Sequence, residues 1–218
     1  MRTAVVTLIA VGLATGAFAQ ETTPPATATA TAPPAAPAAS PATPQAAAPA
    51  SAPAPAPPPV LPTTGDGAEV LSVLQKVCVP VVNGGSLDQL APAAGLKKSR
   101  KTGGYSITMA SGRDYTITVL PPGANPNVCQ VELRYAVDQS QPIVTALNIW
   151  TILHVPELKP QRRDFSVDSE NKRITTSWEY YTDKESTGLV FVELRRPDGG
   201  ALNGKFDTAT LQYSQRKF

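Results

Sequence analysis

The hydrophobic positions after residue 63 begin with helical spacing. Apolar residues recur every three or four positions, at Val70, Leu71, Leu74, Val77, Cys78 and Val81. This spacing predicts an amphipathic helix over about 67–79, ended by Pro80 together with Asn83-Gly84-Gly85. Asp66 and Glu69 are spaced as a capping box at its start. A second, short helix is expected from Ser86 to about residue 94.

From Tyr105 onward, apolar and polar residues alternate, which is the spacing of half-buried strands. Six strands are expected, over 105–109, 115–119, 129–135, 173–181, 189–195 and 208–215, with 165–167 as a further short candidate. Between the third and fourth strands, residues 140–153 return to helical spacing and Pro156 ends them. The order predicts an α+β domain with two principal helices and a mainly antiparallel sheet of about six strands.

The chain before this domain has a different composition. Arg2, a ten-residue apolar run over 4–13 and the small residues of Ala17-Phe18-Ala19 predict a secretory signal peptide over 1–19. The apolar run is too short for a membrane anchor, which needs about 20 residues. Residues 20–62 hold 14 of the 23 prolines and predict a disordered Pro/Ala-rich linker. The single globular domain is then expected over 63–218.

The two cysteines, Cys78 and Cys129, are expected to form a disulfide, because the signal peptide directs the chain to an oxidising compartment. A metal or redox pair is the alternative, but the spacing of 51 positions contains no CxxC. One cysteine lies on the helical stripe and the other on a strand, so the bond would hold the helix on the sheet. The expected location is periplasmic or secreted, with no membrane-spanning segment after cleavage.

The residue types that catalysis needs are scarce. His154 is the only histidine, and the chain has no GxSxG, GxxxxGKS/T or GxGxxG motif. No motif implies a metal ion or a cofactor. Two close acid pairs, Asp168 with Glu170 and Asp183 with Glu185, fall in expected turns. They leave a carboxylate-dependent hydrolase as an alternative to a binding protein.

Four positive charges lie within five residues, at Lys97, Lys98, Arg100 and Lys101. Such a run suits an anionic lipid or cell-wall surface, or an acidic envelope protein. The alternative is a solvated loop, since the whole chain carries a net charge of only +2. Nucleic acid is not expected as a partner, because the chain is exported and no aromatic residues interleave the basic ones.

Ser111-Gly112-Arg113-Asp114-Tyr115 resembles the SGxxY motif of periplasmic inhibitors of C-type lysozymes. The resemblance implies a compact β-barrel and a loop, containing Ser111, Gly112 and Tyr115, that enters the lysozyme cleft. The same residues also suit a hairpin turn followed by a tyrosine that starts a strand.

Together, the signal peptide, the Pro/Ala-rich linker, the expected disulfide and the lack of a recognisable set of catalytic residues favour a non-enzymatic binding domain of the cell envelope. A lysozyme inhibitor and a carboxylate-dependent hydrolase are the two alternatives.

Overall fold

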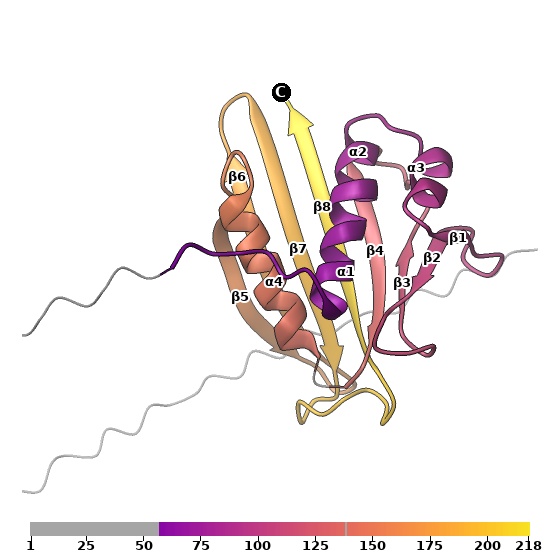
Figure 1. Cartoon of the computed structure of the whole chain (residues 1–218). Helices are drawn as coiled ribbons and strands as arrows, with labels where there is room; N and C mark the ends of the chain where they lie inside the picture. The colour runs from indigo at the N-terminus through magenta and orange to yellow at the C-terminus, as the bar shows by residue number, and fades with distance from the viewer. Residues whose placement is uncertain (1–56, 138) are drawn as a thin grey trace, which may run out of the picture. The chain divides into compact units, whose positions relative to one another are not determined.

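The structure has two layers, with helices packed on one face of a single sheet (Figure 1). The segments with helical spacing form the first layer, and those with strand spacing form the second. The computed structural model describes residues 57–137 and 139–218. The signal peptide expected over 1–19 and most of the linker expected over 20–62 lie outside these residues. In the part of the chain described, no helix is long and apolar enough to cross a membrane.

The first helix is longer than its pattern predicts. It consists of α1 (Gly65–Val73), the π-helical turn η1 (Leu74–Cys78) and α2 (Val79–Val82). The expected end at about residue 79 is wrong, because the helix continues past Pro80, which is the second residue of a new α-helical turn after the π-helical one. The helix ends at Val82, and Asn83 of the expected Asn83-Gly84-Gly85 stop is its C-cap. The other helices are α3 (Leu87–Ala93) and α4 (Ser140–Leu153).

The sheet has eight strands, and the expectation of about six is wrong. The strands are β1 (Lys97–Lys98), β2 (Tyr105–Thr108), β3 (Thr116–Val119), β4 (Val128–Tyr135), β5 (Lys159–Val167), β6 (Lys172–Tyr181), β7 (Glu185–Arg195) and β8 (Asp207–Lys217). Their order is β1-β2-β3-β4-β8-β7-β6-β5, and all neighbours are antiparallel. The mainly antiparallel α+β fold is therefore confirmed.

The two additional strands escaped the pattern for physical reasons. All nine residues of β5 are exposed, so this edge strand shows no alternation of apolar and polar positions, and only its last three residues were a candidate. β1 has only two residues, which is too short for a period.

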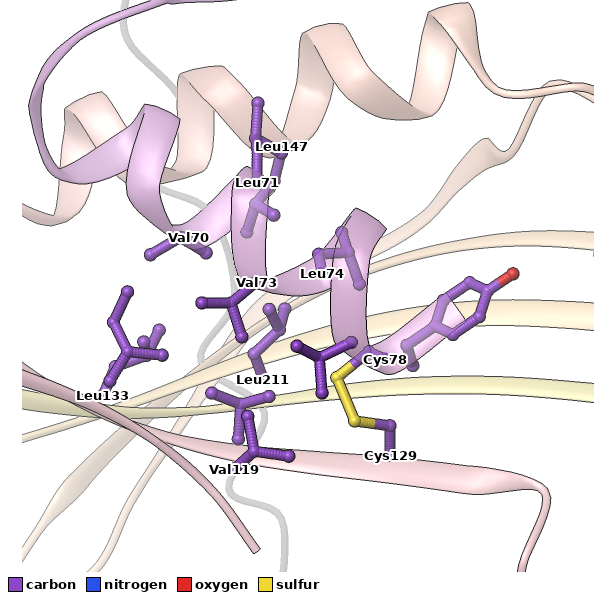
Figure 2. Close-up of a cluster of buried hydrophobic side chains, with 14 of the residues drawn as sticks. Val70, Leu71, Val73, Leu74, Cys78, Val119, Cys129, Leu133, Leu147 and Leu211 are labelled. Carbon is purple, nitrogen blue, oxygen red and sulfur yellow. A yellow bond between two sulfur atoms is a disulfide. The ribbon is translucent and has the colours of Figure 1, made fainter. Parts of the chain in front are cut away.

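The core lies between the helices and the sheet. Figure 2 shows apolar side chains of the first helix, such as Val73, facing Val119 of β3 and Leu211 of β8. The expected disulfide is confirmed: Cys78 at the end of η1 is bonded to Cys129 of β4, with 5.3 Å between their Cα atoms. Both cysteines are buried, so the bond fastens the first helix to the middle of the sheet.

Candidate binding surface

Helices cover one face of the sheet, and the other face carries the strand residues that alternate with the core side chains. We call this second face the open face. On β3 and β8, buried residues such as Ile117 and Leu211 alternate with residues on the open face. Most of these open-face residues are threonines. Since side chains alternate across a strand, these threonines lie on the open face, on the two sides of β4.

A groove of about 530 Å³ crosses β3, β4 and β8 on the open face. Its floor includes Thr116 and Thr118 of β3 and Thr208 and Thr210 of β8. These strands are far apart in sequence and are joined through β4, which pairs with both. The groove thus has threonine hydroxyl groups on both sides of β4, and that of Thr118 is buried and shares a hydrogen bond of 2.9 Å with Ser106 Oγ. We call it the threonine groove.

Two cations line the threonine groove. Lys101 comes from the β1–β2 loop and Arg134 from β4. The Arg134 guanidinium lies 3.5 Å from the centre of the Phe206 ring, which fixes its plane through a cation–π contact. Among the described residues neither cation forms an ion pair. Glu132 supplies the single acid of the lining, so the groove carries one excess positive charge.

The threonine groove continues across the sheet. A hollow of about 270 Å³ shares Leu194 and Thr210 with it, and a further hollow of about 280 Å³ shares Arg173 and Val190 with that one. The three hollows form one shallow trough that extends from β3 to β5. We call it the open-face trough.

Of the basic run at 97–101, only Lys101 reaches the threonine groove. Lys98 instead lies 3.3 Å from Asp88 of α3, and the Tyr105 hydroxyl donates to the same carboxylate. The Tyr105 hydrogen bond, followed by Lys98, holds the pKa of Asp88 below its usual value. The remaining members of the run, Lys97 and Arg100, are exposed.

Two acids of the first helix hold the β2–β3 turn. Ser111 Oγ donates to Asp66 Oδ2 at 3.0 Å, and the Ala110 N–H donates to the two carboxylate oxygens of Glu69 at 2.9 and 3.0 Å. The expected capping box is therefore wrong: residue 64 is the N-cap and no side chain caps the helix. The carboxylates bond to a distant turn in place of the helix's own N–H groups.

The other residues of the SGxxY segment also have internal contacts. Gly112 has a φ of +152°, and a Cβ atom there would lie 3.3 Å from the Tyr115 ring. Tyr115 is half-buried and packs against the core. The open eight-stranded sheet with its helical layer also differs from the compact β-barrel that the resemblance implies.

His154 and the acid pairs lie at separate places. His154 Nδ1 is 2.6 Å from the Pro156 carbonyl oxygen, at the end of α4. Asp168 accepts two backbone N–H groups of its own turn between β5 and β6, and these bonds lower its pKa. Asp183 and Glu185 lie at the β6–β7 turn. No group of three or more His, Cys, Asp or Glu in the described residues is arranged to hold a metal ion.

A buried charge cluster joins the ends of three strands to α4. The Tyr135 hydroxyl donates to Glu193 Oε1 at 3.0 Å, and Arg195 lies 3.7 Å from the same oxygen. Arg195 is also 3.0 Å from Asp207 Oδ2 and donates to Ser140 Oγ at 3.2 Å. Sequence reasoning missed this cluster, although charged residues at core-facing strand positions were a signal for it.

The buried tyrosines are expected to resist ionisation in the folded protein. Burial raises the pKa of Tyr213 to about 12, and burial together with the Glu193 charge raises the pKa of Tyr135. The unfolded value is about 10. These tyrosines therefore contribute stability below about pH 10, and the contribution is lost as the pH rises towards 12.

Phenolate absorbance during an alkaline titration measures this effect. At about pH 11, midway between the unfolded and folded values, at least two of the six tyrosines should remain neutral in the folded chain. In urea, all should ionise together near pH 10. Simultaneous ionisation of all six in the folded chain would contradict the prediction.

No protein-family model, no curated protein and no solved structure matches this chain.

Proposed function

We propose that the domain is a non-enzymatic binding module of the cell envelope and that its open-face trough holds an acidic glycan. The observation that carries this proposal is the threonine groove, in which Lys101 and Arg134 stand without an acid partner among the described residues. The groove offers hydroxyl groups and cations together. An anionic, hydroxyl-rich ligand needs both.

The chemistry of the lining matches such a glycan. A threonine hydroxyl both donates and accepts hydrogen bonds, as a sugar hydroxyl does. Arg134 has a fixed plane over Phe206, and a guanidinium can bind a carboxylate or phosphate oxygen pair. Lys101, on a loop, supplies a second and more adjustable cation.

The shape favours a polymer over a small molecule. Small-molecule sites are usually concave and enclose most of the ligand surface. The open-face trough is shallow and continuous across several strands, so it suits an extended chain with repeated units. The expected export of the protein would bring it to the glycans of the envelope.

Binding of the full chain to polygalacturonate tests the proposal, with neutral dextran as the comparison polymer. The double variant Lys101→Gln/Arg134→Gln should lose at least about ten-fold in affinity, which corresponds to 1.4 kcal/mol. Lys76→Gln is the matched control, because Lys76 is exposed on the helical layer. Added salt should weaken binding to the unaltered chain, because the contacts are between charges.

Two results would overturn the proposal. The first is that polygalacturonate binds no more tightly than dextran. The second is that Lys76→Gln loses as much affinity for polygalacturonate as the double variant does. Polyglutamate serves as a third polymer. If it binds as tightly as polygalacturonate, the groove recognises negative charge alone and the assignment to glycans fails.

A further inference from the structure

The outer edge of β5 has no partner strand among the described residues. All nine of its residues are exposed, and Phe165 and Val167 expose 64% and 52% of their surface. Their strand partners on β6 place both side chains on the helical side of the sheet. An exposed edge with apolar side chains is a template for pairing with another strand.

The hydrogen bonds at the β5–β6 turn show which backbone groups face outwards. The Asp168 N–H donates to the Asn171 carbonyl oxygen at 2.9 Å, so this pair is a hydrogen-bonded one. Such pairs alternate with non-hydrogen-bonded pairs along an antiparallel ladder. The N–H and C=O groups of Val167, Phe165 and Arg163 therefore point away from β6, towards the open edge.

The backbone features that protect an edge, a proline and a bulge, are confined to the first part of β5. Pro160 lacks an N–H, and the register with β6 shifts between Pro160 and Arg162. From Arg162 to Val167 the register is continuous. The second part of the strand is thus regular and able to accept a neighbour.

We propose that β5 pairs with β5 of a second copy of this chain, antiparallel, about a two-fold axis at Phe165. In this register the two Phe165 side chains lie opposite each other on the helical side. On the open face, Arg162 lies opposite Asp168 of the second copy and Asp164 lies opposite Ser166 of the second copy. No like charges lie directly opposite, and the two sheets become one of sixteen strands.

The neighbouring registers are less favourable. An axis at Arg163 would place two guanidinium groups opposite each other, and like charges in that position destabilise a pair. An axis at Asp164 would use the same outward-facing backbone groups, because it pairs Arg163 with Phe165 of the second copy, but it would place two carboxylates opposite each other. Of these three registers, only the axis at Phe165 opposes no like charges. This self-complementarity is why the occupant is a second copy, as in other two-fold interfaces.

A cysteine at the axis tests the register. In Phe165→Cys the two new thiols would face each other, with their Cα atoms about 5.5 Å apart, within the range for a disulfide. The only native cysteines are already bonded to each other, so the new thiol is the single free one. Oxidation should give a covalent dimer that a mild reductant separates.

Arg163→Cys is the matched control. Residue 163 would face Val167 of the second copy, so its two thiols would lie about 13 Å apart at ~3.3 Å per residue and should not bond. Equal crosslinking of the two variants, or none in Phe165→Cys, would overturn the proposal.

Sedimentation of the unaltered full chain and of Phe165→Pro gives a second test. The proline removes an outward-facing N–H, so it should leave the β5–β6 bonds in place while converting dimer to monomer. Thermal unfolding shows whether the variant folds, and if it does not, the cysteine pair still decides. The proposal would be contradicted if the unaltered chain were monomeric at every concentration tested. It would also be contradicted if Phe165→Pro folded and still formed the dimer.

Discussion

Replacing Arg195 with methionine should lower the free energy of unfolding by about 3–5 kcal/mol, because it leaves buried carboxylates without their cation. Glu193 and Asp207 expose only 7% and 1% of their surface, and Arg195 lies within ion-pair distance of both. Urea unfolding at neutral pH measures the change. The loss should appear as a lower transition midpoint.

Two further variants test whether the uncompensated buried charge causes this loss of stability. Arg196→Met breaks an exposed ion pair with Asp198 and should cost less than about 1 kcal/mol. Adding Glu193→Gln and Asp207→Asn to Arg195→Met should recover part of the loss, because the uncompensated charge is then removed. If Arg195→Met costs no more than Arg196→Met, the buried charge cluster does not stabilise the fold in the way described.

Removal of the disulfide is expected to lower the free energy of unfolding about as much as Arg195→Met does. The bond joins residues 51 positions apart, and the chain-entropy model gives about 4 kcal/mol for a loop of that length. The double variant Cys78→Ala/Cys129→Ala should therefore unfold at a much lower urea concentration. Its loss should exceed that of the reduced unaltered chain, because alanine also leaves space in the core.

The reduced chain is the control for the crosslink alone, since its thiols occupy nearly the same volume. Unfolding of reduced and oxidised chains at the same urea concentration would show that the loop constraint contributes nothing. That result would contradict the prediction.

Periodicity predicted those parts of the fold that have one buried side and one exposed side. The strands that contain Ile117, Leu133 and Leu211 bury alternate residues, so their pattern is visible in the sequence. β5 buries none of its residues and carries no such pattern. The acids at 66 and 69 were misassigned because a local spacing cannot reveal that a turn more than 40 residues away supplies the donors.

The candidate binding surface was less accessible to sequence reasoning. Charge density identified Lys101, one member of the threonine groove. Arg134 and Phe206 are distant in sequence and meet only because β4 pairs with β8. The threonine pairs at 116 and 118 and at 208 and 210 were a signal, but their placement on the two sides of β4 depends on strand order, which periodicity does not determine.

The position of β8 has a consequence for how the domain acquires its structure. β8 is the last strand in chain order, yet it lies between β4 and β7 in the sheet. The two four-strand runs can join only after nearly the whole chain is available, and such long-range pairing slows folding. Because β8 also supplies Thr208 and Thr210, the threonine groove comes into existence only at this last step. A partly synthesised chain that ends before β8 would therefore lack the groove.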